Sequence, residues 1–169
     1  MDALECIMSR RSIRKYKLQP VPADAVQKVV EAGFAAPSAA NQRPCHFIVI
    51  DDREILNKIV ETNPHAGMLA TAAFAVAICF DDSPKAIKAL IIDDCSAAAE
   101  NMLLAANALG YGSVWIGIHH DETKQKNARA ALNLPDGVKT TSIIAVGISD
   151  ETPAPRAKAD PKMIHKNGW

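Results

Sequence analysis

The segment 91–109 contains neither glycine nor proline, and six of its residues are alanine. Alanine has the highest intrinsic helix propensity, and its small side chain lets a neighbouring backbone approach closely. Apolar residues fall on several sides of the segment, which predicts one long helix buried nearly all round, either in the core or at a subunit interface. Gly110 and Gly112 then end this helix.

The rest of the chain alternates between helix and strand patterns. We expect further helices after the capping residue Asp2, between Pro22 and Pro37, over residues 54–62 and from Asp121 through Leu132. We expect strands over residues 46–50, 74–80, 113–118 and 141–148. This alternation alone favours a doubly wound parallel sheet.

Charge and composition argue against several classes of function. Nineteen basic residues balance nineteen acidic residues, so no net field attracts nucleic acid or an anionic membrane. The first residues lack the pattern of a signal peptide, and the apolar stretch 68–80 is shorter than the roughly 20 residues that span a bilayer. We therefore expect a single soluble, cytoplasmic domain over residues 1–169, with four reduced and mostly buried cysteines.

A basic cluster near the N-terminus is the strongest site that the residues themselves suggest. It consists of Arg10, Arg11, Ser12 and Arg14, which we expect to project from the end of the first helix into a loop. Guanidinium groups bind a phosphate through paired hydrogen bonds, and a hydroxyl adds another donor. Because the chain has no net charge, such a phosphate site must be local.

Other patterns predict sites less well. His119, His120 and Asp121 are metal-ligating residue types, but adjacent residues on a strand point to opposite faces and rarely bind one ion. Gly110 and Gly112 follow a helix and lack the third glycine of a dinucleotide-binding loop. No pair of side chains has the pattern of a nucleophile and its base, so we expect no metal and no catalytic side chain.

Four motifs, in this order, resemble those of the flavin-dependent nitroreductase family. Residues 10–14 (Arg-Arg-Ser-Ile-Arg) are similar to its opening Arg-x-Ser-x-Arg/Lys motif, and residues 37–41 (Pro-Ser-Ala-Ala-Asn) to its Pro-Ser-x-x-Asn loop. Residues 109–117 resemble the turn and strand beside the flavin ring. Residues 155–158 (Pro-Arg-Ala-Lys) resemble a C-terminal basic pair that returns to the phosphate. Together the motifs span about 150 residues, the length of a whole domain.

This resemblance implies an α+β fold, with helices around a mostly antiparallel sheet, and an intertwined homodimer that binds two FMN molecules at its interface. The tail from about residue 150 would dock, since its three prolines prevent a regular helix and Trp169 gains by burial. No nucleic acid or membrane partner is expected.

The resemblance also assigns cofactor-binding roles. The phosphate and ribityl chain of FMN would be held by Arg10, Arg11, Ser12, Arg156 and Lys158. Arg14 would lie near the pyrimidine end of the ring, and the backbone of Ile116 and Gly117 would line the ring. The other subunit would reach the same flavin through its loop residues Pro37, Ser38, Ala39 and Asn41.

The implied activity is that of an oxidoreductase. Electrons would pass from NADH or NADPH through FMN to a nitroaromatic, a quinone or a similar small acceptor by a ping-pong mechanism, with the chemistry on the flavin. Two alternatives stay open. One is another flavin reaction of the superfamily, such as flavin reduction, reductive dehalogenation or flavin fragmentation. The other is a non-catalytic flavin-binding regulator.

The chain departs from the family pattern in two places. The family loop usually continues Asn-x-Gln-Pro-Trp, whereas Arg43 and Cys45 here replace the amide and the indole. Between Phe80 and Ile91 there is no long insertion that could form a lid over the substrate. We therefore expect an open pocket of altered shape and broad specificity.

Overall fold

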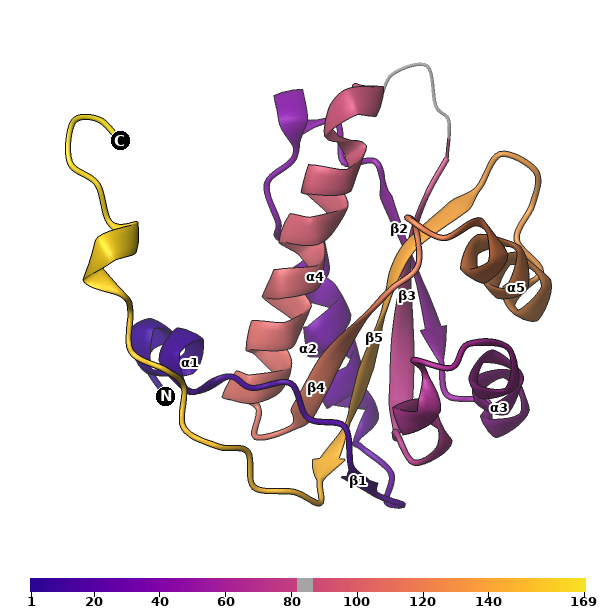
Figure 1. Ribbon diagram of the computed structural model, residues 1–169. Coiled ribbons are helices and arrows are strands. Elements are labelled where there is room, and N and C mark those ends of the chain that lie inside the picture. The colour runs from indigo at the N-terminus through magenta and orange to yellow at the C-terminus, as the bar shows by residue number, and fades with distance from the viewer. Residues whose placement is uncertain (82–86) are drawn as a thin grey trace.

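The computed structural model describes residues 1–81 and 87–169, and this part of the chain forms five α-helices and five β-strands (Figure 1). In chain order they are α1 (Ala3–Ser9), β1 (Tyr16–Lys17), α2 (Ala23–Phe34), β2 (Cys45–Ile50), α3 (Arg53–Thr62), β3 (Phe74–Phe80), α4 (Ile91–Ala108), β4 (Gly112–Gly117), α5 (Glu122–Leu132) and β5 (Lys139–Ser149). The sequence predicts that no lid-forming insertion lies between Phe80 and Ile91. Residues 82–86 of that stretch lie outside the described residues.

Every pairing between the named strands is antiparallel, and β5 lies at the centre of the sheet. The order runs β1, β5, β3 and β2, and β4 also pairs with β5. The parallel sheet that the alternation favours is therefore wrong, and the α+β fold is confirmed.

The antiparallel pairing follows from the positions of α3 and α5 between the strands. Ile50 at the end of β2 pairs with Ala75 near the start of β3, and Gly117 at the end of β4 pairs with Ser142 in β5. Each following strand thus begins at the end of the sheet where the previous strand stops. The helices α3 and α5 do not carry the chain back across the sheet, so their flanking strands run antiparallel.

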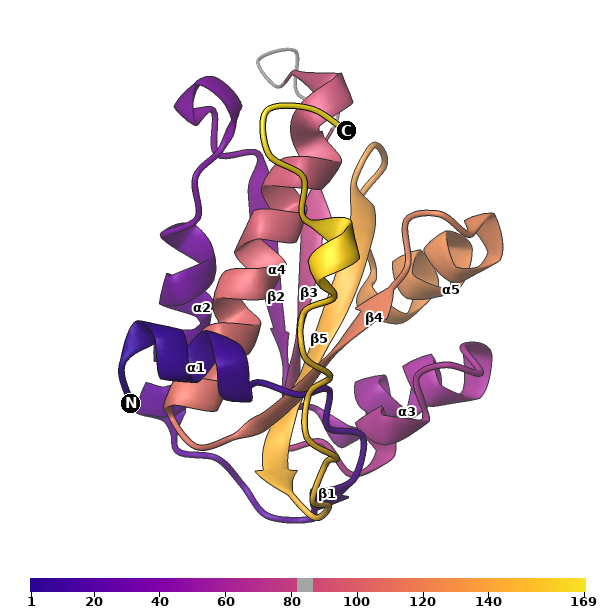
Figure 2. The same ribbon diagram turned by 60° about the vertical axis from the view of Figure 1, so that its left-hand side comes forward.

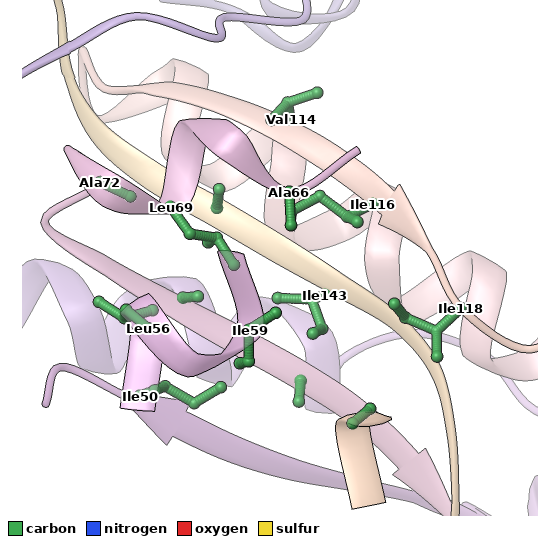
Figure 3. Close-up of a cluster of buried hydrophobic side chains, with 14 of the residues drawn as sticks. Ile50, Leu56, Ile59, Ala66, Leu69, Ala72, Val114, Ile116, Ile118 and Ile143 are labelled. Atoms are coloured by element: carbon green, nitrogen blue, oxygen red, sulfur yellow. The ribbon is translucent and has the colours of Figure 1, made fainter. Parts of the chain in front are cut away.

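Helices cover both faces of the sheet and create two apolar layers. Along β3, Val76 and Ile78 pack with α2 and α4, whereas Ala77 and Cys79 pack toward α3 and α5. The second layer is drawn in Figure 3, where Leu56 and Ile59 of α3 point toward Ile143 of β5. The strand β3 is buried along its whole length, as its uninterrupted apolar sequence predicts.

The alanine-rich segment forms the long helix α4 of one layer, as expected, but it is not buried nearly all round, since Asp93 and Ala108 are exposed. In α4 the side chains of Ala98, Ala99, Met102 and Ala106 are all at most 1 % exposed. The helix α2 approaches α4 closely because Gly33 of α2 faces α4. A Cβ on this glycine would lie 2.2 Å from Cε of Met102. Small residues therefore bring α2 and α4 together.

The first helix is capped by Asp2 as predicted, and most of its apolar side chains are exposed. The carboxylate of Asp2 accepts a hydrogen bond from the Glu5 backbone N–H at 2.9 Å. The apolar residues Leu4, Ile7 and Met8 are nevertheless exposed, and among the residues of α1 only Cys6 is buried. The helix ends at Ser9, so the basic cluster lies on extended chain that follows it.

The tail beyond β5 runs past α1 (Figure 2) and then away from the body of the molecule (Figure 1). Trp169 is fully exposed and stacks on His165, with ring centroids 4.5 Å apart. Its expected burial is therefore wrong for the single chain. No helix within the described residues is both long and apolar enough to cross a membrane.

Candidate active site

The basic cluster lies on a segment that is held against the edge of β4. Ser12 pairs in parallel with Ser113, and the Ile13 backbone N–H donates to the Ser113 carbonyl at 2.9 Å. The hydroxyl of Tyr16 donates to the Ile13 carbonyl at 2.6 Å. Burial raises the pKa of this phenol, which keeps it a hydrogen-bond donor at neutral pH. The backbone that carries Arg10, Ser12 and Arg14 is thus fixed from both ends.

Arg10 and the tail meet, although they are separated by most of the chain. The Arg10 carbonyl accepts a hydrogen bond from Nη2 of Arg156 at 2.9 Å. Nε of Arg10 lies 3.3 Å from Oε1 of Glu100 on α4, and the Arg10 side chain is 19 % exposed. Lys158 follows two residues after Arg156 on the exposed tail. The structure therefore brings Arg156 of the tail to the predicted N-terminal cluster.

Arg11 connects the tail to the first helix. Its Nε donates to the Ala154 carbonyl at 3.2 Å, and its Nη1 donates to the carbonyls of Met8 and Arg10 at 2.9 and 2.8 Å. These three bonds occupy Nε and Nη1, so only the two N–H groups of Nη2 could still bind an anion. Arg11 thus positions the tail, and Arg10, Ser12 and Arg156 keep donors for a phosphate.

Arg14 lines a large pocket beside β4. Its backbone N–H donates to the carboxylate of Glu151, which also accepts from the Lys15 backbone N–H at 3.2 Å. The side chain lines a pocket of about 660 Å³. The other walls come from β4, from the loop before β3 and from the start of α5, namely Pro64, His65, Gly67, Met68, Val114, Trp115, Ile116, Gly117, His120 and Lys124.

The edge of β4 offers backbone hydrogen-bonding groups to this pocket. The Ser113 carbonyl points away from β5, because it accepts from Ile13. Backbone groups of every second residue in a strand point the same way, so those of Trp115 and Gly117 also face outward. Ile116 lies between them, paired with Ile143, and its side chain is 3 % exposed. Ile116 and Gly117 were predicted to line the ring through their backbone. The strand pairing indicates that Gly117 and Trp115, rather than Ile116, present their backbone groups to the pocket.

Several pocket residues have no counterpart in our sequence predictions. His65, Met68, His120 and Lys124 line the pocket, and Gly117 leaves room for the imidazole, since a Cβ there would lie 2.9 Å from Cε1 of His120. The chain segments that carry these residues are far apart in sequence. Only His65 and His120 had a signal, as polar residues shortly after a predicted helix and a predicted strand, which are positions where functional loops occur.

The loop between α2 and β2 has a strained backbone. Ala40, Asn41 and Arg43 have φ angles of 48°, 54° and 49°, in the left-handed region that non-glycine residues seldom occupy. Ser38 Oγ accepts from the Arg43 backbone N–H at 2.8 Å, and Asn41 Oδ1 accepts from Nε of Arg43 at 3.0 Å. Arg43, which replaces the family's amide, therefore holds both polar side chains of the predicted cofactor loop.

This loop is anchored on α4, away from the basic cluster. The carboxylate of Asp94 accepts from the Ala39 backbone N–H at 2.8 Å, and Pro37 and Ser38 line a separate pocket beside it. Glu100, which pairs with Arg10, lies six residues further along the helix, or about 9 Å at 1.5 Å per residue. The loop lies at the upper end of α4 in Figure 1, and the segment 10–15 lies toward the lower end. One chain therefore does not bring Ser38 and Asn41 together with Arg14 and Gly117.

The histidine pair does not form part of a metal site. His119 and His120 have ring centroids 5.4 Å apart in an edge-to-face arrangement. Within residues 1–81 and 87–169, no three His, Cys, Asp or Glu side chains are grouped to hold an ion. The site instead combines cations, an open strand edge and a broad pocket, which suits a flat polar ring that carries an anionic group.

Comparison with known proteins gives consistent matches over the whole chain. The model of the Nitroreductase family matches residues 7–66 and 61–148. A protein of Methanothermobacter thermautotrophicus, provisionally named NADH dehydrogenase/NAD(P)H nitroreductase, is 41 % identical over 169 residues, which cover 100 % of this chain and 88 % of that protein.

Solved structures agree with these matches. An FMN-dependent nitroreductase from Clostridium difficile has a TM-score of 0.90 and 31 % identity, and the alignment covers 98 % of this chain and 99 % of that one. A nitroreductase-type protein from Desulfovibrio desulfuricans, solved in complex with FMN, has a TM-score of 0.85 and 26 % identity over 100 % of this chain and 99 % of that one.

Proposed function

Because the chain belongs to the nitroreductase family, we propose that it is an FMN-dependent oxidoreductase that transfers electrons from NADH or NADPH to small acceptors such as nitroaromatics or quinones. The observation that carries this proposal is the pocket of about 660 Å³ along the open edge of β4, directly beside the basic cluster. An oxidoreductase that uses a flavin needs a binding surface of this kind and no nucleophilic side chain.

The residues of the chain fit FMN at both of its ends. The guanidinium groups of Arg10 and Arg156, with the hydroxyl of Ser12, would bind the phosphate. Charge-assisted hydrogen bonds of this kind are roughly twice as strong as those between neutral groups. The backbone groups of Trp115 and Gly117 would donate to and accept from the polar edge of the ring. Arg14 would place positive charge beside that edge.

When bound, FMN supplies the hydride and electron chemistry. The protein's own residues would bind and orient the flavin and place positive charge in the pocket. His65, His120 and Lys124 add hydrogen-bond donors at the pocket wall and would orient an acceptor that carries oxygen atoms, such as a nitro group or a quinone. A pocket of this openness would admit donor and acceptor one after the other, which is the basis of a ping-pong mechanism.

We further propose that the active form is a homodimer. Ser38 and Asn41 lie on the loop that Asp94 anchors to α4, away from the basic cluster of the same chain, so we expect them to contact the flavin of a second copy. The exposed apolar residues of α1 and of the tail, including Leu4, Met8 and Trp169, would be covered in such a dimer.

The visible absorption spectrum of the purified full chain tests the proposal. After incubation with FMN and gel filtration, the protein should be yellow, and heat should release FMN rather than FAD. NADH or NADPH added without oxygen should bleach the flavin, and a quinone or nitroaromatic should restore the colour. Initial rates should give parallel double-reciprocal lines. A protein that retains no flavin, or whose flavin neither nicotinamide bleaches, would contradict the proposal.

A further inference from the structure

Two cysteines from distant parts of the chain lie side by side beneath the loop 37–44. Cys45 is the first residue of β2, and Cys95 lies near the beginning of α4. Their Sγ atoms are 3.3 Å apart, within hydrogen-bond distance. Since a disulfide has an S–S distance of about 2.05 Å, the two sulfur atoms would need to approach by only a little over 1 Å.

The two thiols differ in access and in acidity. Cys95 is 1 % exposed, whereas Cys45 is half-buried and lines a pocket of about 170 Å³ together with Ser38 and Arg43. The hydrogen bond from Cys95 lowers the pKa of Cys45, against the opposite effects of burial and of the nearby Asp94 carboxylate. The same hydrogen bond and burial raise the pKa of Cys95. Cys45 is therefore the more accessible and the more readily ionised of the two thiols, and Cys95 retains its proton more strongly.

We propose that Cys45 and Cys95 form a redox-active pair, which hydrogen peroxide or an organic hydroperoxide oxidises to a disulfide between β2 and α4. The Cys45 thiolate attacks a peroxide oxygen and the O–O bond breaks, leaving a sulfenic acid on Cys45. The leaving group is a hydroxide from hydrogen peroxide, or an alkoxide from an organic hydroperoxide, and it is protonated to water or to the alcohol. The Cys95 sulfur then attacks the Cys45 sulfur, loses its proton and displaces the hydroxyl as water. The two thiols lose two electrons, and the peroxide gains them.

This disulfide would restrain the loop that carries Ser38 and Asn41. Asp94, the neighbour of Cys95, already holds the Ala39 backbone N–H, and the loop enters β2 at Cys45. Oxidation would add a covalent connection between that entry point and the same turn of α4. The loop would then be fixed to α4 at both of its ends, and the pocket that contains Cys45 would become narrower.

The other two cysteines provide matched controls. Cys79 is buried on the opposite face of the sheet, with Sγ 3.5 Å from Oγ1 of Thr140, and burial raises its pKa. Cys6 of α1 is buried, with Sγ 3.1 Å from the Leu104 carbonyl. Among the described residues neither thiol has another cysteine beside it, so neither should form a disulfide within the chain.

Peptide mapping of the FMN-loaded full chain tests the pair. Reduced protein is treated with one equivalent of hydrogen peroxide, its remaining thiols are alkylated, and its peptides are analysed without reduction. We expect one linked peptide that joins Cys45 to Cys95, loss of two of the four thiols, and recovery of both with dithiothreitol. The variants Cys6→Ser and Cys79→Ser should behave in the same way.

Two further variants assign the roles of the sulfur atoms. Cys95→Ser should accumulate a sulfenic acid on Cys45 that dimedone traps, whereas Cys45→Ser should form neither the sulfenic acid nor the link. In the wild-type chain, amide hydrogen exchange over residues 38–45 should slow on oxidation, and Cys45→Ser should show no such change. The proposal is overturned if all four thiols survive, if the link joins two chains, or if Cys45 proceeds to sulfinic acid without a link.

Discussion

Arg10 has two candidate partners, the carboxylate of Glu100 and the phosphate of a bound flavin. If the guanidinium binds the phosphate, Arg10→Ala should weaken FMN binding by about 2–3 kcal/mol, the scale of a hydrogen bond between charged groups. Fluorescence titration of the apoprotein with FMN measures this change. Arg156→Ala should weaken binding less, because its side chain lies on the exposed tail.

Glu100→Gln separates this role from a structural one. The substitution removes the competing charge 3.3 Å from Nε of Arg10, so FMN binding should stay the same or become tighter. If Arg10 served only to pair with Glu100, both variants would weaken FMN binding equally. Arg129→Ala is a second control, since Arg129 pairs with Asp136 on an exposed surface away from the pocket.

Gly112 sets how closely the basic cluster approaches the sheet. A Cβ at this position would lie 2.7 Å from Cγ2 of the buried Ile13, so Gly112→Ala must displace the segment 10–15. Overpacking of this kind costs about 1–3 kcal/mol, and we expect that loss in the free energy of unfolding measured with urea. Gly67→Ala, where a Cβ meets no atom within 4 Å, should change stability little. Equal effects of the two substitutions would contradict the steric argument.

At the scale of single elements, Gln125 of α5 completes the hydrogen bonding of β5. The partner strand β4 ends at Gly117, opposite Ser142, which leaves Thr140 beyond its reach. Oε1 of Gln125 accepts from the Thr140 backbone N–H at 3.1 Å, and Nε2 donates to the Thr140 carbonyl. Because Thr140 is fully buried, an unpaired group there costs about 1–3 kcal/mol.

Gln125→Ala should therefore lower the free energy of unfolding by about that amount in urea denaturation. Gln27→Ala is the matched control, because Gln27 bonds only to Glu31 on the exposed side of α2. That variant should stay within about 0.5 kcal/mol of the wild type. A Gln125→Ala protein as stable as the control would mean that water replaces the amide at Thr140.

Elements with strong local signals could be predicted from the sequence, and their arrangement could not. The apolar run of β3, the cap Asp121 and the glycine-free helix α4 are encoded in neighbouring residues. The strand β1 has only two residues and exists because β5 pairs with it, so no local pattern predicts it. Strand direction likewise depends on where α3 and α5 lie against the sheet.

The site divides in the same way. The basic cluster and the loop 37–44 were visible as sequence motifs, and the structure shows that they lie on separate parts of one chain. The wall formed by His65, Met68, His120 and Lys124 was missed, because only folding brings these residues together. That Trp115 and Gly117 present their backbone also required the strand pairing of β4.

At the scale of the whole molecule, the chain carries more exposed apolar surface than its own core can cover. Leu4 and Met8 of α1 are 74 % and 63 % exposed, and Met163, Ile164 and Trp169 of the tail are 79 %, 71 % and 104 % exposed. The helix α1 and the tail both lie outside the layer that α2 and α4 form (Figures 1 and 2). A second copy that receives the tail would bury both sets and would also place its own loop 37–44 near the first chain's basic cluster.

Removing residues 159–169 tests this arrangement, because it deletes the exposed apolar part of the tail and keeps Lys158 and the contacts of Ala154 with Arg11 and of Arg156 with Arg10. Each large apolar side chain contributes about 1.5–3 kcal/mol when buried. Loss of three should raise the dimer dissociation constant by more than about 100-fold in sedimentation across a dilution series.

Asn41→Ala is the companion variant, since it should weaken FMN binding and leave the dimer intact. FMN that contacts two chains stabilises their association by mass action, so the wild-type holoprotein should resist dilution better than the apoprotein. The truncated chain should lose FMN and its partner over the same range of dilution, whereas Asn41→Ala should lose only FMN. A wild-type holoprotein that is monomeric with full FMN occupancy would show that one chain forms the whole site, and that Ser38 and Asn41 do not serve a neighbour's flavin.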